Sequence, residues 1–334
     1  VLFRSERQLP FDLGLTLAYA GSRGMNLMQT KEGNPTIPRG VAQNGLCVAP
    51  SSPVAFSADG PKCWLAGEPR TNPGWDTVDL RTAAGNSWYN SLQFALVKRL
   101  QRGLQFQSSY TYSKVLDETQ GQLGVDDGAG GTTGDDPSNR RFDKGAATFD
   151  LRHQWRFNAI YRLSVNAQGI TGKLVNGWWL SGIVTWNTGF PFVPSSSTQF
   201  SRSLVAGANG GQKRPNVIAG ADVDKITRGG SLGCTIGTGA TARVIAPGAK
   251  LGTPELFFDP CAFAIPSAGF LGNSARGLIY GPNFSSLNFS LVKDTALPRL
   301  GEAGSLQYRL EVFNALNHPS FGVPARNEIG RAHV

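Results

Sequence analysis

The sequence predicts an all-β fold, a partial antiparallel transmembrane β-barrel of the outer-membrane type. Seven stretches of at least 11 residues alternate apolar and polar side chains, which is the period of a strand. The segments between them run 65, 3, 31, 14, 95 and 9 residues, alternately long and short. Antiparallel strands that cross a bilayer put every second connection on one side, and outer-membrane barrels keep one side short. The predicted strands are 11–21, 87–100, 104–116, 148–162, 177–188, 284–294 and 304–315.

The composition agrees with this fold class. The 334 residues include 42 glycines and 10% aromatics, with only 16% charged residues, as in many strands joined by turns. No apolar run approaches the roughly 20 residues that a membrane helix needs. The net charge is +9, but the basic residues are scattered, whereas nucleic-acid binding proteins gather them on one face. We therefore expect a solvated barrel rim and no nucleic-acid partner.

The two ends of the chain have an unusual relation to each other. Residues 1–5 and 328–334 can be encoded by inverted copies of one nucleotide string, although short peptides can also match by chance. We interpret both ends as translated sequencing adapter and exclude them from the fold, as one would a tag. The barrel is then expected to occupy residues 6–327.

The first predicted strand, 11–21, has one apolar face and one face of small or polar residues. In a soluble protein the apolar face would be core, and in a membrane barrel it would face lipid, so periodicity alone leaves both open. The apolar face comprises Phe11, Leu13, Leu15, Leu17 and Tyr19.

The hairpin of 87–100 and 104–116 favours a membrane barrel over a soluble sheet. Its polar face carries Gln93, Arg99, Gln107 and several hydroxyls. Burying such groups in a dry core without partners would cost about 1–3 kcal/mol each, whereas a water-filled lumen accepts them. Aromatic side chains also gather towards the long-loop ends, as an interfacial girdle does. These are Trp88, Tyr110 and Tyr112.

The later strands repeat the alternation, except that Trp178 and Trp179 fall on opposite faces of 177–188. Two to four further strands are expected within 22–86 and 189–283. Segments 76–81 and 214–219 are candidates for them.

The four cysteines all fall in the two longest connections. An even number in exposed loops predicts disulfides in an oxidising compartment, although four unpaired thiols would also fit. The expected pairs are Cys47–Cys63 and Cys234–Cys261. Zinc is not expected, because no pair of cysteines has the close spacing of zinc ligands.

The long connections hold the candidate binding residues. Asp126, Asp127, Asp135 and Asp136 are weak candidates for calcium, and an acidic solvated loop is the alternative. Arg140 and Arg141 can neutralise part of this acidic segment or contact a ligand. Five aromatic residues can stack on a sugar or grip a peptide, or can pack the loops together. They are Trp64, Trp75, Phe190, Phe192 and Phe200.

No arrangement of residues indicates catalysis. The sequence has no nucleophile elbow, no Cys/His pairing and no HExxH, and its glycines miss the GxGxxG spacing. We expect neither an enzyme nor a bound cofactor.

Several segments, in this order, resemble the barrel of TonB-dependent outer-membrane receptors of the Oar-like type. The resemblance implies a barrel of about 22 strands in the bacterial outer membrane, surrounded by lipid. It also implies an N-terminal plug and uptake of an extracellular solute with energy supplied through the TonB complex. We expect this chain to hold barrel strands without the plug or the TonB box. The segments are 86–99 (NSWYNSLQFALVKR), 102–114 (RGLQFQSSYTYSK), 136–145 (DPSNRRFDKG), 149–153 (FDLRH), 176–184 (NGWWLSGIV) and 313–321 (FNALNHPSF).

Two other functions fit the same strands. A passive porin or adhesin-like barrel would share the membrane location without energy coupling. A soluble all-β carbohydrate-binding protein or propeller would bury the apolar faces instead.

Overall fold

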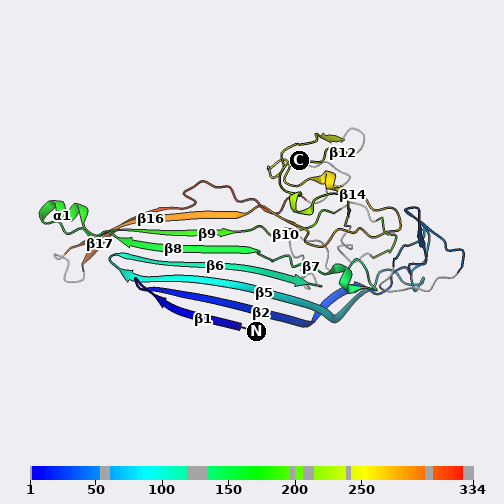
Figure 1. The fold of residues 1–334 in the computed structure, drawn as a ribbon, viewed down its shortest axis with the longest axis horizontal. Helices are drawn as coiled ribbons and strands as arrows, with labels where there is room; N and C mark the ends of the chain where they lie inside the picture. Colours follow the sequence, from blue (N-terminus) through cyan, green and yellow to red (C-terminus); the bar gives the residue numbers. More distant parts are fainter. Residues whose placement is uncertain are drawn as a thin grey trace.

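A computed structural model describes residues 2–52, 61–118, 134–195, 200–205, 214–237, 242–297 and 304–325. Within these residues one nine-stranded antiparallel sheet dominates the molecule (Figure 1). Eight strands follow one another in the order β1-β2-β5-β6-β8-β9-β16-β17, and β7 (Gly145–Ala146) pairs with the end of β6. The eight are β1 (Leu2–Leu9), β2 (Leu13–Glu32), β5 (Asp79–Gln101), β6 (Leu104–Asp117), β8 (His153–Arg162), β9 (Trp178–Asn187), β16 (Phe284–Ala296) and β17 (Ser305–Val312).

The connections sort by length to the two ends of the sheet, which confirms the predicted rhythm. Residues 10–12, 102–103, 163–177 and 297–304 join neighbouring strands at one end. The long connections 33–78, 118–152 and 188–283 all emerge at the other end (Figure 1). The hairpin between β5 and β6 turns through Arg102 (φ 51°) and Gly103 (φ 83°). A glycine fits there because a left-handed backbone is disfavoured for residues with a Cβ atom.

The two faces of the sheet differ in polarity from β2 across to β16. One row of paired residues runs Leu15, Leu96, Ser108, Phe157, Val184 and Leu287, and every member but the serine is apolar. The adjacent row on the opposite face runs Thr16, Ala95, Ser109, Arg156, Thr185 and Ser286. The predicted division into an apolar and a polar face is therefore confirmed for β2, β5, β6, β8, β9 and β16, whereas the edge strand β1 places Arg7 beside Leu15 and breaks it.

The apolar face is not covered by any other part of the described chain. Leu92, Phe94, Tyr161 and Leu310 are all exposed on it. Monomeric soluble proteins rarely expose contiguous apolar surfaces of more than a few hundred Å², because hydration of that surface is unfavourable. The face instead has the character of a surface that meets lipid. No helix in the described residues is long and apolar enough to cross a membrane.

Several predicted boundaries are wrong. β2 and β5 continue about 10 residues past their predicted ends at the long-loop side, through a bulge between Gly24 and Met28 that breaks the alternation. Segment 76–81 contributes only its last residues to β5, and 214–219 forms β11 (Asn216–Val217), outside the main sheet. The predicted strand 148–162 begins only at His153, because Asp150 turns inward to accept a hydrogen bond from the Val115 backbone.

The described residues of 22–86 and 189–283 add no strand to the main sheet beyond these extensions, and its eighth long strand is β1. Residues 2–5, interpreted above as adapter, lie in β1, whereas 328–334 lie outside the described residues. Among the described strands β1 and β17 form the two edges of an open sheet, and all their side chains are exposed. Such edges present unpaired backbone groups to further strands.

The long connections carry short paired segments of their own. They are β3 (Val41–Gln43) with β4 (Leu46–Val48), β10 (Pro191–Phe192) with β15 (Ile279–Tyr280), β11 with β14 (Phe263–Ala264), and β12 (Cys234–Ile236) with β13 (Arg243–Ile245). A seven-residue helix, α1 (Gly169–Val175), lies in the short connection between β8 and β9, at the opposite end of the molecule (Figure 1).

The polarity of the two faces predicts how an added charge will change the folding free energy. Replacing Phe157 by Arg puts a cation in the middle of the apolar face, where it should cost about 2–4 kcal/mol of folding free energy in a bilayer. Asn158→Arg is the matched control, because the next residue points to the polar face and should cost less than about 1 kcal/mol. Denaturant titration of the two variants in lipid vesicles measures the difference, and equal costs would contradict the assignment of faces.

Candidate functional site

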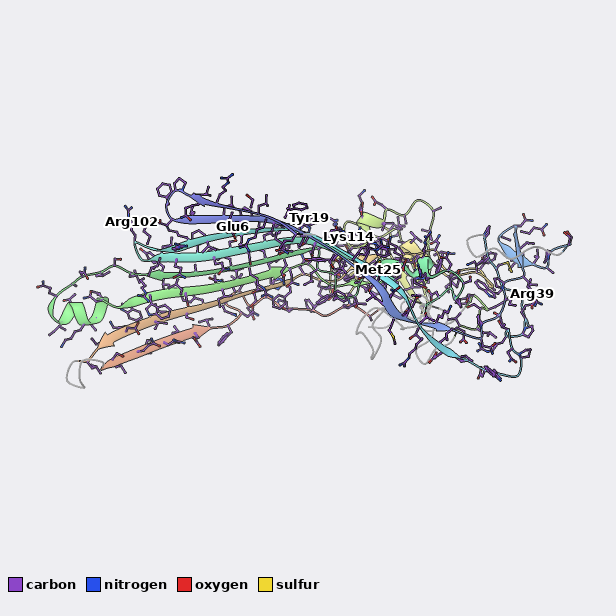
Figure 2. All side chains as sticks on the ribbon, turned by 90° about the horizontal axis from the view of Figure 1, so that it is seen from below. Glu6, Tyr19, Met25, Arg39, Arg102 and Lys114 are labelled. Carbon is purple, nitrogen blue, oxygen red and sulfur yellow. A yellow bond between two sulfur atoms is a disulfide. The ribbon has the colours of Figure 1, made fainter. Side chains whose placement is uncertain are left out.

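The long connections 33–78, 118–152 and 188–283 fold against one another at one end of the sheet, and we call this assembly the loop cap (Figure 2). Its apolar core is small and comes largely from the third connection. Phe192 and Phe258 pack with ring centroids 5.8 Å apart, and Phe263 lies 6.3 Å from Phe258. The buried cluster comprises Phe192, Ile226, Phe258, Ala262, Phe263 and Ile279.

A buried arginine joins the third connection to the second. Arg214 Nε donates to Asp135 Oδ2 at 2.8 Å, and Arg214 Nη2 donates to Asp143 Oδ1 at 3.1 Å. The same guanidinium donates to the Ser274 carbonyl at 3.1 Å and lies 4.4 Å from the centroid of the Phe142 ring. Because Arg214 is almost fully buried, the arginine and the carboxylates depend on one another for their solvation.

The two carboxyl groups at Arg214 compete for one positive charge. Burial, and then repulsion from Asp135, raise the pKa of Asp143 to about 8, while Arg214 opposes the rise. Asp143 therefore retains its proton at neutral pH, and Asp135 forms the ion pair with the guanidinium. This arrangement leaves the buried group without net charge, which a low-dielectric site requires.

A second buried group lies where the cap meets the sheet. Tyr280 donates to Asp150 Oδ2 at 2.5 Å, and Arg152 Nη2 donates to the Tyr280 hydroxyl oxygen at 2.8 Å. Burial, followed by the hydrogen bond to Asp150, raises the pKa of Tyr280 to about 12. Nearby, Arg276 pairs with Asp117 and donates to its backbone carbonyl at 2.7 Å. Burial lowers the pKa of Arg276 to about 10, so this guanidinium stays charged at neutral pH.

The first connection is attached by both charged and neutral contacts. Lys62 pairs with Asp136 and donates to the Ser138 hydroxyl at 2.9 Å. The Thr36 hydroxyl donates to the Arg202 carbonyl at 2.9 Å, and Arg70 donates to the Leu204 carbonyl at 2.9 Å. Each of the three long connections is therefore bonded to the other two.

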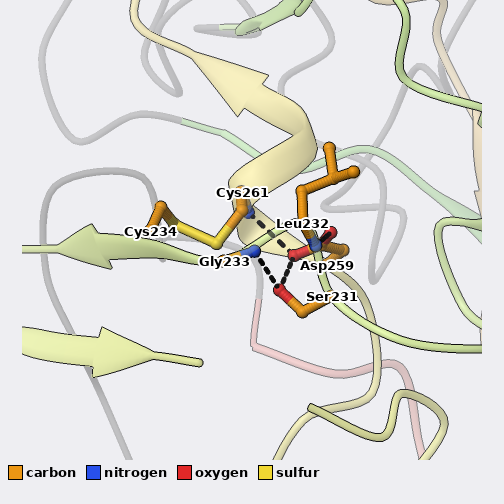
Figure 3. Close-up of a disulfide and its surroundings, with 6 residues drawn as sticks. All are labelled: Ser231, Leu232, Gly233, Cys234, Asp259 and Cys261. Atoms are coloured by element: carbon orange, nitrogen blue, oxygen red, sulfur yellow. Dashed lines mark hydrogen bonds between the residues drawn. A yellow bond between two sulfur atoms is a disulfide. The ribbon is translucent and has the colours of Figure 1, made fainter. Parts of the chain in front are cut away.

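Both expected disulfides are present, and the described residues include no free cysteine. Cys47–Cys63 joins residues 16 positions apart, and Cys234–Cys261 joins residues 27 positions apart. Asp259 supports the second disulfide, since its carboxylate accepts hydrogen bonds from the Ser231 hydroxyl and from the Leu232 and Cys261 backbones (Figure 3). By the chain-entropy model, each link stabilises the cap by about 3 kcal/mol.

The structure corrects two of the five aromatic candidates. Trp64 is 2% exposed and Phe192 0% exposed, so neither side chain can reach a ligand outside the cap. Trp64 Nε1 donates to the Thr36 carbonyl at 3.0 Å, which is a packing role. Phe200 is half-buried, whereas Trp75 and Phe190 are 65% and 46% exposed. Trp75 and Phe190 remain free to contact a solute.

The acidic candidates for calcium have other partners where the structure describes them. Asp135 is bound by Arg214 and Asp136 by Lys62, while Asp126 and Asp127 lie outside the described residues. In the described part of the chain no group of three or more His, Cys, Asp or Glu side chains could hold a metal ion. Arg140 Nε lies 3.5 Å from Glu118 Oε2, and Arg140 Nη1 donates to the Ala84 carbonyl. Arg141 is exposed.

Sequence reasoning missed Arg214, Arg276, Asp150 and Tyr280, which hold the cap together. Their partners in another connection or strand include residues between 71 and 159 positions away along the chain, so no local spacing reveals them. A usable signal was present in 136–145 and 149–153, the two motifs that contain Asp143 and Asp150. Both motifs resemble segments of TonB-dependent receptors, but that resemblance does not predict which residues they contact.

A separate cavity of about 380 Å³ lies on β1, β2 and β5 near the short connections. Glu6, Thr16 and Arg99 are among its lining residues. It lies far from the loop cap along the strands and is not part of the candidate site.

Comparison with known families gives the following match. The model of the family described as "Outer membrane beta barrel domain" matches residues 2–333. No curated protein and no solved structure gives a significant match.

The ion pair between Arg214 and Asp135 can be tested by removing the guanidinium. Arg214→Met leaves Asp135 buried without its cation, and we expect the cap to lose about 3–5 kcal/mol of stability. The control is Arg309→Met, because Arg309 on β17 pairs with Glu311 at 3.4 Å in an exposed position. Its loss should lower the stability by less than about 1 kcal/mol. Urea unfolding followed by tryptophan fluorescence, to which buried Trp64 contributes, measures both, and a loss no larger than the control's would contradict the role of Arg214.

Proposed function

The chain belongs to the outer membrane beta barrel domain family, and from this we propose that it is barrel sequence of a TonB-dependent receptor. The family and its β-strands place the protein in the bacterial outer membrane. In the proposed function the receptor captures a solute at the cell surface and imports it with energy transmitted by TonB.

The loop cap is the observation that carries the proposal. Its three connections span 33–78, 118–152 and 188–283, far longer than the turns at the other end of the sheet. Long loops with little regular structure are uncommon unless they serve a function, because ordering them costs conformational entropy. Buried ion pairs and two disulfides offset that cost here. A rigid loop assembly at the outer end of the strands is suited to selective capture.

The polar face of the sheet supports passage of a hydrophilic solute. One row near the cap runs through Ala18, Gln93, Thr111, Gln154 and Asn187, and its last four side chains offer amide and hydroxyl groups to water or to a solute. A lumen lined in this way does not penalise polar groups that pass along it.

The motif at 136–145 connects the cap to the proposed receptor class. This segment is among those that resemble TonB-dependent receptors. In the structure it supplies Asp136 to the ion pair with Lys62 of the first connection, and Asp143 to the hydrogen bond from Arg214 of the third. The η1 turn (Arg140–Asp143) within it is capped by Asn139, whose side chain accepts from the Arg141 backbone. The resembling residues therefore organise the surface to which we assign capture.

The gene and its product test the proposal together. We expect the full-length gene to encode a plug domain ahead of this region, and the full-length protein to bind the purified periplasmic domain of TonB. This chain alone is the control and should not bind it. A coding sequence that starts directly ahead of β2, together with passive conductance in planar bilayers and no TonB binding, would contradict the proposal and support a porin.

A further inference from the structure

Two cations contact one tryptophan on the apolar side of the sheet, and a third lies on the neighbouring strand. Lys144 Nζ lies 4.0 Å from the centroid of the Trp88 ring, and Arg23 Cζ lies 5.8 Å from it. Arg23 is also the direct strand partner of Trp88 across β2 and β5. Lys114 lies on the neighbouring strand β6, paired with Asn90, two residues from Trp88 along β5. We call Arg23, Lys114 and Lys144 the cationic cluster.

The cationic cluster lies just beyond the apolar band, towards the loop cap. The last row of the band runs Tyr19, Leu92, Tyr112 and His153. The next row on the same face holds Asn90 and Lys114, and the following row holds Arg23 and Trp88. Figure 2 shows Tyr19 on the sheet and Lys114 beyond it, towards the loop cap. Two residues of strand advance about 7 Å, so Lys114 lies about 7 Å and Arg23 about 14 Å beyond the band, measured along strands that tilt in the membrane. The cluster therefore begins at the depth of the lipid headgroups when the band spans the hydrocarbon.

The positive charge of the cluster is not balanced by the described part of the chain. Arg23, Lys114 and Lys144 are exposed, and none forms an ion pair with a described carboxylate. The nearest acidic residues along the strands are engaged elsewhere, since Asp117 pairs with Arg276, and Glu118 accepts from Asn86 at 2.8 Å. The Trp88 ring attracts cations but carries no net charge. The cluster is therefore complementary to an anion with several negative charges.

We propose that the cationic cluster and Trp88 bind the phosphate groups of a phosphorylated glycolipid in the outer leaflet of the membrane. The phosphates contact Arg23, Lys114 and Lys144, and the acyl chains lie along the apolar band that begins with Leu92. Long loops mark the outer side of such barrels, which assigns the cluster to the outer leaflet. The inference concerns the lipid-facing surface and does not depend on which solute, if any, is imported.

A lipid titration of the full chain in neutral detergent tests the proposal. Native mass spectrometry measures the affinity for lipid A with two phosphates and for the same lipid with its phosphates removed. We expect at least a tenfold preference for the phosphorylated form, because each basic residue near a lipid surface contributes about 1 kcal/mol. In the triple variant Arg23→Gln, Lys114→Gln, Lys144→Gln the preference should fall below about threefold.

Two further variants control for net charge and for folding. Arg99→Gln, Arg102→Gln, Lys173→Gln removes the same charge at the other end of the sheet and should keep the preference. Arg23→Lys, Lys114→Arg, Lys144→Arg keeps the charge in place and should keep it as well. The proposal is overturned if the unmodified chain shows no preference for phosphate, or if both glutamine variants lose it equally.

Discussion

The opposite polarity of the two faces of one sheet is the constraint on which the rest of the structure depends. The strands from β2 to β16 place apolar side chains such as Leu15 and Phe94 on one face, and small or polar ones such as Thr16 and Ala95 on the other. In a soluble sheet the apolar face is buried by a second layer, and here no described segment covers it. A bilayer on one side and water on the other satisfies both faces. Location, strand length and the sorting of loops all follow from that requirement.

Because successive strands are antiparallel, the constraint also brings the long connections together. Each of them leaves and re-enters the sheet at the same end, so segments far apart in sequence meet there (Figure 1). The small apolar core of the loop cap cannot hold so much chain alone. Buried pairs such as Arg214 with Asp135, and Arg276 with Asp117, complete it. Breaking such a pair is costly because it leaves a buried charge without its partner, so these residues fix the arrangement of the loops.

The sequence was sufficient to predict features that depend on the local alternation of side chains and on spacing along the chain. The long strands, their faces, the alternation of loop lengths and the local disulfide pairs are of this kind. The bulge between Gly24 and Met28 was not predictable, since it interrupts the alternation that identifies a strand. The partners of Asp135 and Asp143 were not predictable either, because the single arginine that joins them lies over 70 residues away. The burial of Trp64 and Phe192 follows from tertiary packing, which spacing along a loop does not encode.

Site-directed spin labelling in lipid vesicles tests the central claim most directly. Labels at Leu15, Phe94 and Leu291 should be accessible to oxygen dissolved in the hydrocarbon and shielded from a water-soluble nickel chelate. Labels at the adjacent positions Thr16, Ala95 and Ser290 should show the reverse. If the first set were shielded from both reagents, the apolar face would be packed against protein, and the membrane account of this sheet would be wrong.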